Sequence, residues 1–574
     1  EREITQIISA GTVSELDLLE AKRANYLGAV HAGDGAFGLA YADLSTGEFR
    51  LTEVGSMAAL QDELARVAPA ELLVSDQQAE LFSGMEGTLA HDGYAFLAEQ
   101  AEFILCEHFG VKSLDGFGCG GMRQAVAAAG AMVHYLKHQL RRKIEHLTAL
   151  RCDVPAAHVL LDLATQANLE LVASRGARDM SLLAALDRTV TPMGARKLRS
   201  WILQPLRDLA ELECRQQMIA DLLSEPELLG SLRAGLKGVR DVERAIGRLS
   251  QVSGNARDVV ALRTSLEQIP ELKRELGKLL ERAGFGKAPE PTYAARIQEE
   301  MREMPELAAK LAAAIVEEPP MTLKDGGLFQ DGFSADLDEL RRASRQGKSW
   351  ITELQEREIA QTGIKSLKVR FNSVFGYFIE ITKSNLAGVP AHYTRKQTTV
   401  GGERFITPEL KEMEAQILGA DERARHLELQ LFQTLREETL RDLSAIQGIA
   451  AAIATLDVIC GLAETARLFH YARPVLEQSL RLEIRDGRHP VLDQNLAEEK
   501  FVPNDTSLDG AEMRLAIITG PNMAGKSTYI RQVALIVLMA QMGSFVPAAS
   551  ARIGLVDRIF TRVGANDDLS RGQS

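Results

Sequence analysis

Eight residues late in the chain have the types and the spacing of a loop that holds a nucleoside triphosphate. They fit the pattern G-x-x-x-x-G-K-[ST], in which backbone N–H groups surround phosphate oxygens, a lysine reaches the outer phosphates and a hydroxyl binds Mg²⁺. The pattern predicts that the chain binds ATP or GTP with Mg²⁺, and that Ser527 is the metal ligand. The loop and the threonine after it comprise Gly520, Pro521, Asn522, Met523, Ala524, Gly525, Lys526, Ser527 and Thr528.

The elements around this loop must hold it in place. Residues 515–518 are a short apolar run typical of a buried strand, and residues 528–541 have the pattern of a helix. A helix that begins at such a loop directs the positive end of its dipole at the anion. The sequence therefore predicts a strand, a phosphate loop and a helix in that order.

Length and composition indicate a large, mostly helical protein of several domains. At 574 residues the chain exceeds the roughly 250–300 residues at which a single core stops growing. Aromatic residues make up only 5%, and leucine, alanine, glutamate and arginine dominate, which favours helices. The longest apolar run near the loop, residues 534–540, is far shorter than the ~20 residues that span a bilayer, so we expect no membrane association.

Cysteine usage and net charge restrict the compartment and the partners. The five cysteines are widely spaced and include no C-x-x-C pair, so we expect free thiols in a reducing cytoplasm. A net charge of −13 excludes a surface that binds nucleic acid everywhere, but it allows a local basic patch. The chain starts at Glu1 without a methionine or a signal peptide, so its N-terminus looks cut.

Residues 1–118 have the pattern of a compact α/β unit. Its expected elements are strands at 26–30, 37–41, 48–51 and 71–74 and helices at 57–67 and 77–82. Asp43 and Glu48 lie close to these strands and are conceivable metal ligands, although turn and surface positions are the favoured interpretation.

The middle of the chain is helical and carries a small β-insert. The helical pattern runs from about residue 121 to 363, and residues 335–361 predict one long charged helix. A second long helix begins at Thr407-Pro408 and could run to about residue 446. Between these helices, residues 367–371 and 377–382 alternate like strands, which predicts a helical lever with a β-rich tip.

The tip segment is basic, unlike the rest of the chain. Residues 365–404 hold seven basic and two acidic side chains. Such a segment suits DNA phosphates, which position a duplex without reading its bases. A solvated charged face is the alternative interpretation. The candidate DNA contacts are Lys368, Arg370, Asn372, Lys383, Arg395, Lys396 and Arg404.

Taken together, these segments resemble the bacterial MutS mismatch-repair family over nearly the whole chain. The most specific stretch is the phosphate loop itself, and further family-like blocks surround it in a fixed order. An ordered set of this kind makes chance similarity remote. The blocks are residues 186–194 and 407–412 in the helical part, 367–382 in the tip, and GRHPV (487–491), GSFVP (543–547) and IFTRVGANDDL (559–569) around the loop.

The resemblance implies a multidomain fold with α/β and all-α parts, and a role in DNA mismatch repair. Family members are dimeric ABC-type ATPases that close around double-stranded DNA, recognise mispaired or unpaired bases and signal to MutL. The implied domains are an RNase H-like connector without nuclease chemistry (1–118), a helical core and outgoing lever (119–365), a β-rich DNA clamp (366–404), a returning lever helix and core (405–470), and the N-terminal part of the P-loop ATPase domain (471–574).

The resemblance also implies roles for single residues. Phe501 falls where the family stacks an aromatic ring on adenine, with an ordinary core position as the alternative. Asn522 would orient the attacking water or a γ-phosphate oxygen, or else shape the turn beside Pro521. Ser574 resembles the start of the signature loop that reaches the γ-phosphate of the partner subunit.

Two departures from the family pattern limit what we expect of this chain. The N-terminal domain with the Phe-x-Glu mismatch wedge is absent, and Phe378-Ile379-Glu380 belongs to a strand of the tip. Walker B, an apolar strand ending in Asp-Glu, is also absent: Asp567-Asp568 follows no such strand, and residues 159–162 have the pattern of a helix interior. We therefore expect a fragment that binds ATP without the carboxylates for hydrolysis. The alternatives are an ATP-gated DNA-binding and dimerisation scaffold, or a MutS homologue that acts in recombination.

Overall fold

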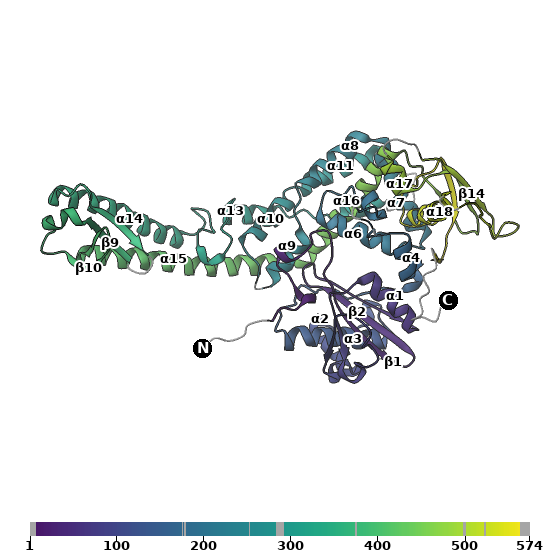
Figure 1. Ribbon diagram of the computed structural model, residues 1–574, viewed down its shortest axis with the longest axis horizontal. Helices are drawn as coiled ribbons and strands as arrows, with labels where there is room; N and C mark the ends of the chain where they lie inside the picture. The colour runs from purple at the N-terminus through teal and green to yellow at the C-terminus, as the bar shows by residue number, and fades with distance from the viewer. Residues whose placement is uncertain are drawn as a thin grey trace. The chain divides into compact units, whose positions relative to one another are not determined.

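The chain forms two compact units. The computed structural model describes residues 7–174, 176, 179–251, 253–282, 292–372, 376–496, 501–521 and 524–562 (Figure 1). One unit comprises residues 1–254, 261–308 and 442–574, and the other comprises residues 255–260 and 309–441. Many helices and several sheets are present, as expected for a mixed α/β chain.

A six-stranded sheet forms the N-terminal part of the first unit, in the order β5-β4-β1-β2-β3-β6. Successive residues of a strand point to opposite faces. Leu39 packs in one core with Leu60 of α1, whereas its neighbour Ala40 packs in another core with Ala128 of α3. Helices therefore cover both faces. The elements are β1 (Leu27–Gly33), β2 (Ala36–Asp43), β3 (Glu48–Val54), α1 (Met57–Val67), β4 (Glu71–Ser75), β5 (Thr88–His91), α2 (Ala98–Phe109), α3 (Arg123–His134) and β6 (Arg151–Cys152).

The sequence predicted most of this sheet. The four expected strands overlap β1 to β4, and α1 has the predicted bounds. The helix expected at residues 77–82 is wrong, because Asp76–Gln78 form a short 3₁₀ turn and further turns follow. The sheet also continues past residue 118, since α3 packs on β1, β2 and β3, and β6 pairs with β3.

A buried helix, α16 (Leu443–Phe469), forms the centre of the helical part of the first unit. Among the described helices it is the one that could cross a membrane by length and composition, but 72% of its most apolar window is buried in the protein. A helix that is apolar all round belongs in a core when neighbours surround it, and α6, α7, α8, α9 and α12 pack against α16. The helices of this region are α4 (Leu163–Asn168), α5 (Leu182–Leu186), α6 (Pro192–Leu203), α7 (Leu209–Ser224), α8 (Pro226–Lys237), α9 (Val242–Ser250), α11 (Ile269–Arg282) and α12 (Tyr293–Glu300).

A buried carboxylate of α16 fixes the start of α6. Thr191 caps α6 by accepting a hydrogen bond from the N–H of Gly194. Asp457 is fully buried, and it accepts hydrogen bonds from the N–H groups of Val190 and Thr191 and from the Thr191 hydroxyl. Several donors offset the cost of burying this side chain. The contact therefore fixes Val190 and Thr191 against α16 at the start of α6.

Two sequence predictions for the helical part are wrong. The helix expected from Thr407 to about residue 446 ends as α15 at Leu440, and α16 begins at Leu443. No proline or glycine marks this break, which falls where the chain passes from one unit to the other. Residues 159–162 are not a helix interior, because β7 (Leu160–Leu161) pairs with β16 (Arg558–Ile559) from far along the chain.

The second unit is built on two long helices and a four-stranded sheet in the order β10-β11-β9-β8. Figure 1 shows this sheet at one end of the helix pair. The bounds of α14 agree with the predicted charged helix. The sequence predicted β8 and β9 but missed β10 and β11, because their mostly polar residues do not alternate. The elements are α14 (Ala335–Thr362), β8 (Lys368–Asn372), β9 (Gly376–Thr382), β10 (Thr394–Thr398), β11 (Gly402–Ile406) and α15 (Pro408–Leu440); α10 (Ala256–Leu266) and α13 (Pro305–Ala314) include residues of both units.

A second four-stranded sheet lies towards the C-terminus of the first unit, in the order β12-β15-β13-β14. Helix α18 packs against β13 of this sheet and against α17. The elements are β12 (Val475–Glu477), β13 (Leu482–Gly487), α17 (Pro490–Asn495), β14 (Asn504–Leu508), α18 (Lys526–Gln541) and β15 (Ser550–Gly554).

Candidate functional sites

The predicted phosphate loop leads directly into helix α18. Gly525 is the N-cap of the helix and has a φ of 84°, a left-handed conformation that glycine adopts without strain. Because Gly525 has no side chain, nothing at the N-cap position competes with an anion for the first turn of the helix. The Lys526 ammonium donates a hydrogen bond to the Gly520 carbonyl, which places the cation across the loop. The hydroxyl-bearing Ser527 is exposed in the same turn.

These residues fit a magnesium–nucleotide complex. The glycine N-cap, the cation across the loop and the exposed hydroxyl are the groups that this chemistry requires. Pro521, Ala524 and Gly525 are exposed, and Thr528 is half-buried. Asn522 and Met523 lie outside the described residues, as do Asp567-Asp568 and Ser574.

The strand predicted before the loop is not formed. Residues 515–518 have no regular secondary structure, and Leu515 and Ile517 are 77% and 84% exposed. A strand requires hydrogen-bonding neighbours, and within the described part of the chain no strand pairs with this segment. The strand prediction for residues 515–518 is therefore wrong, because an apolar run does not specify the neighbouring strands that it needs.

Tyr529 connects the phosphate-loop helix to β14. Its hydroxyl lies 2.9 Å from the Thr506 hydroxyl oxygen and donates to the carbonyl of Asp505. Phe501 is half-buried and precedes β14 by a few residues. The strand that follows Phe501 is therefore held against the helix that begins at the loop.

The other end of α18 is bonded to the helical core, a connection that the sequence did not reveal. Arg215 of α7 donates a hydrogen bond to the Met542 carbonyl, and its guanidinium carbon lies 3.5 Å from the ring centroid of Trp201 in α6. Gln541 exchanges hydrogen bonds with the backbone of Leu206. Because these partners are more than 300 positions apart in the sequence, no local pattern predicts them.

The basic tip presents one face of a sheet away from its supporting helices. Directly opposed residues of an antiparallel pair share a face. Ile379 and Phe405 oppose each other, and they pack in a core with Leu354 of α14 and Ile417 of α15. The opposite face carries the next cross-strand row, in which Lys368 opposes Glu380 and Glu380 opposes Arg404.

The predicted DNA contacts do not all lie on this outer face. Lys368, Arg370, Asn372 and Arg404 share it, because they oppose Glu380, Phe378 or Gly376, which alternate onto the same face of β9. Arg395 opposes Phe405 and therefore belongs to the helix-facing side, and a register shift separates it from Gln397. Lys396 lies within that shift, and Lys383 is exposed in a 3₁₀ helix, Lys383–Gly388.

The cations of the outer face differ in their availability. The Lys368 side chain is exposed and makes no hydrogen bond or ion pair with a described residue. Arg370 is 55% exposed and lies 3.6 Å from a Glu380 oxygen. Arg404 is half-buried, donates to the Gln397 amide oxygen and lies over the Phe378 ring. Lys368 and Arg370 are thus better placed than Arg404 to contact a phosphate backbone.

Phe378 and Glu380 share the outer face, as predicted from strand alternation. Phe378 is only 2% exposed beneath Arg404, so its ring cannot intercalate between bases. This geometry agrees with the prediction that the Phe-x-Glu spelling of the tip is not a mismatch wedge.

Of the conceivable metal ligands, Asp43 lies at the turn between β2 and β3 but is fully buried, whereas the Glu48 side chain is 31% exposed. Asp43 accepts hydrogen bonds from Asn25 and from the backbone and hydroxyl of Ser45. Glu48 accepts from the Tyr26 hydroxyl and pairs with Arg50. In the described part of the chain no group of three or more histidine, cysteine or acidic side chains could hold a metal ion.

Comparison with protein families identifies three matches along the chain. Residues 25–148 match MutS domain II, residues 164–463 match MutS domain III and residues 516–574 match MutS domain V. The domain III match alone covers more than half of the chain.

Curated relatives match the chain over its whole length. The DNA mismatch repair protein MutS of Halothermothrix orenii is 44% identical over 585 residues, that of Symbiobacterium thermophilum is 43% identical over 590 residues, and that of Pelotomaculum thermopropionicum is 45% identical over 584 residues. Each match includes 100% of this chain and 64%, 66% and 67% of the respective relative. The chain thus spans about two thirds of the length of these proteins.

Proposed function

Because this chain belongs to the MutS family, we propose that it acts in DNA mismatch repair as an ATP-dependent DNA-binding protein. The observation that carries the proposal is the geometry of the phosphate loop, in which a left-handed glycine opens α18 and Lys526 lies across the loop. The loop is a local feature of this chain, so it supports nucleotide binding independently of the family match.

The nucleotide site combines residues at the start of α18 with residues from other segments of the chain. Lys526 and the first turn of the helix bind the outer phosphates, and Ser527 binds Mg²⁺, which neutralises phosphate charge when bound. Phe501 stacks on adenine, a role implied by the family resemblance, and the contact of Tyr529 with Thr506 supports it by holding the strand after Phe501 against α18. Asn522 orients a water molecule or a γ-phosphate oxygen, and Ser574 begins the signature loop that reaches the site of a partner subunit.

Replacing Lys526 by methionine tests this site. Lys526→Met keeps the length of the side chain and removes the charge, so ATP should bind at least tenfold more weakly in calorimetry. Arg552→Met is the matched control, because Arg552 is exposed on β15 of the same sheet region. Equal affinity of both variants for ATP would contradict the assignment. ATP binding without turnover in the 574-residue chain would favour the scaffold function over a self-sufficient ATPase.

The second unit contacts DNA through the outer face of its sheet. Lys368 and Arg370 are exposed cations on this face, and phosphate contacts are the principal source of sequence-independent affinity. Asn372 and Arg404 lie beside them, and Lys383 and Lys396 contribute from adjoining segments. Arg395 belongs to the other side, so we propose a smaller role for it than its sequence neighbours suggest.

Two arginines of this sheet form a matched pair for the test. Arg370 lies 3.6 Å from Glu380 and is 55% exposed, whereas Arg395 lies 3.4 Å from Glu403 and is 64% exposed. Arg370→Ala should weaken duplex binding and reduce the salt slope by about 1, whereas Arg395→Ala should leave both close to the parent values. Fluorescence anisotropy across a salt series measures both quantities. A larger loss in Arg395→Ala would reverse the proposed orientation.

Further features rest on the family alone. We propose a cytoplasmic homodimer that signals to MutL, with an RNase H-like connector, a helical core with levers, a DNA clamp and a P-loop ATPase domain. Mispair recognition belongs to the intact protein. Comparing heteroduplex and homoduplex binding by this chain tests that view, and a clear preference for the heteroduplex would refute it.

A further inference from the structure

A cavity lined by strongly basic residues lies between the N-terminal sheet and the helical core of the first unit. Its volume is about 320 Å³, and residues of β3, β6, α6, α7 and α16 line it. Eight arginine and lysine side chains and three carboxylates contribute to the lining, in a chain whose net charge is −13. This charge pattern is opposite to that of the protein as a whole.

Half of these cations already have carboxylate partners. Arg50 pairs with Glu48 and Asp153, and Arg196 pairs with Asp241 and Glu243. Arg66 and Arg215 likewise pair with acidic residues. These ion pairs hold the walls of the cavity in place but add little free positive charge.

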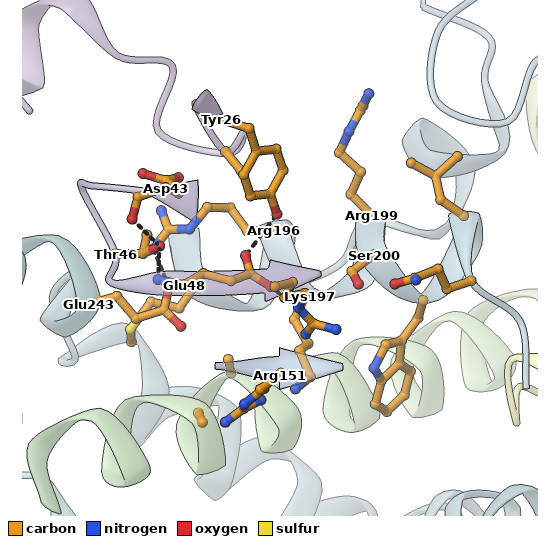
Figure 2. Close-up of a pocket in the computed structure, with 18 of the residues that line it drawn as sticks. Tyr26, Asp43, Thr46, Glu48, Arg151, Arg196, Lys197, Arg199, Ser200 and Glu243 are labelled. Atoms are coloured by element: carbon orange, nitrogen blue, oxygen red, sulfur yellow. Dashed lines mark hydrogen bonds and ion pairs between the residues drawn. The ribbon is translucent and has the colours of Figure 1, made fainter. Parts of the chain in front are cut away.

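Four lining cations make no hydrogen bond or ion pair through their side chains with a described residue. They are Arg23, Arg151, Lys197 and Arg199. Figure 2 shows Lys197 close to the strand that carries Glu48, whereas Arg199 extends away from this group. Lys197 on α6 and Arg151 on β6 therefore supply the excess positive charge of the cavity.

Lys197 is in an unfavourable environment as it stands. Its side chain is half-buried, and burial together with the charges of Arg50, Arg151 and Arg215 lowers its pKa, which Glu243 only partly offsets. An ammonium group without a bonded partner is costly to remove from water. A bound anion would supply the missing partner.

We propose that this cavity binds a small oligophosphate, with Lys197 and Arg151 as its principal ligands. Phosphate suits the site because several cations converge on it from different elements, and arginine binds phosphate oxygens in a planar, bidentate manner. The volume lies at the low end of the range for small-molecule sites, which favours a diphosphate or the phosphate chain of a nucleotide. The Ser200 hydroxyl lines the same cavity and can donate a further hydrogen bond.

The two principal ligands of the proposed site come from different parts of the first unit, so a bound anion would connect these parts. Arg151 belongs to the strand that completes the N-terminal sheet, and Lys197 belongs to a helix that packs on α16. An oligophosphate held by both residues ties the sheet to the helical core, and it therefore raises the unfolding temperature of the chain.

The test uses the 574-residue chain with Lys526→Ala, which silences the phosphate loop as a competing site. Pyrophosphate and ADP are titrated separately by calorimetry at low salt, into this chain and into the same chain with Lys197→Met or Lys112→Met. Lys112 is an exposed lysine that does not line the cavity. We expect one pyrophosphate site that Lys197→Met weakens tenfold or more and Lys112→Met leaves unchanged.

Two further measurements separate a loss of binding from a loss of folding: the unfolding temperature of the Lys197→Met chain and the binding of pyrophosphate by an Arg151→Met chain. Lys197→Met should unfold at the parent temperature or above it without ligand, because it removes an unpartnered cation, and Arg151→Met should reproduce the loss of binding. Binding of ADP that also depends on Lys197 identifies a nucleotide as the ligand class, and binding of pyrophosphate alone identifies a free oligophosphate. Absence of binding, or equal affinity in the Lys197→Met and Lys112→Met chains, would overturn the proposal.

Discussion

Substituting alanine for Gly194 should destabilise the helical core. Gly194 lies in the first turn of α6, and a Cβ atom there would be 2.2 Å from an Oδ atom of Asp457. That carboxylate cannot move freely, because it is fully buried and holds the N–H groups of Val190 and Thr191. The methyl group must therefore displace either the carboxylate or the helix.

The magnitude follows from three opposing contributions. Alanine favours a helix over glycine by about 1 kcal/mol. Overpacking a well-filled site costs roughly 1–3 kcal/mol, and weakening hydrogen bonds to a charged acceptor costs about 1.5–3 kcal/mol. The net loss in the free energy of unfolding should be about 1.5–5 kcal/mol. Gly230 in α8 is the matched control, because a Cβ atom there would meet no other atom within 4 Å, and alanine should stabilise the chain by up to ~1 kcal/mol.

The assay is urea unfolding followed by tryptophan fluorescence. Trp201 lies on α6 and is 6% exposed, so its emission reports on the affected helix. The chain has two tryptophans, and Trp350→Phe removes the signal of the other unit. Combining Gly194→Ala with Asp457→Ala should cost less than the sum of the single changes, because the clash needs both groups. A Gly194→Ala chain as stable as the parent, alongside a stabilised Gly230→Ala chain, would refute the reasoning.

Three further predictions concern other parts of the first unit. Arg215→Lys loses the planar contact with Trp201 and should lower the free energy of unfolding by about 1–3 kcal/mol in the same urea assay; an unchanged midpoint would contradict this. Tyr529→Phe should weaken ATP binding severalfold in calorimetry by releasing Thr506 of β14 from α18, and unaltered affinity would show that the contact does not order the site. Burial lowers the pKa of His146 from 6.5 to about 4. The unfolded chain binds more protons between these values, so stability should fall by roughly 3 kcal/mol as the pH drops from 6.5 to about 4. Urea midpoints at several pH values should therefore vary less in His146→Gln, and an identical pH profile would count against this role.

Local sequence patterns correctly predicted those elements whose structure depends on contacts between neighbouring residues. Gly525 and Lys526 form a helix start and a loop whose geometry depends on neighbouring residues, so their spacing predicted it. Thr407 and Pro408 predicted the start of α15, because an N-cap and a first-turn proline act within one helical turn. The end of α15 was missed, since no proline or glycine marks the break between Leu440 and Leu443, which falls at the boundary of the two units.

Features that depend on contacts between distant residues could not be predicted from the sequence. Residues 515–518 have the composition of a buried strand, yet strand formation depends on neighbours that the described residues do not provide. The sequence did not rank the seven candidate DNA contacts, whereas strand register places four of them on the outer face and Arg395 on the helix-facing side. The remaining two, Lys383 and Lys396, lie in a 3₁₀ helix and in a register shift. The partners of Arg215 and Asp457 likewise come from remote positions.

The sequence by itself determined the chemistry: a phosphate loop, a basic segment in an acidic chain and an ordered set of family-like blocks. Residue types and short spacings carry that information, because a cation, a hydroxyl or a glycine has its properties wherever the chain places it. Only the tertiary structure decided which cations share a surface and which already have partners. Strand register turns Arg395 away from Lys368, and Lys197 and Arg151 line one cavity without an ion pair to a carboxylate of the described residues. The sequence determines how many charged residues the chain has, whereas the net charge at a site depends on the distances between charged side chains in the folded protein.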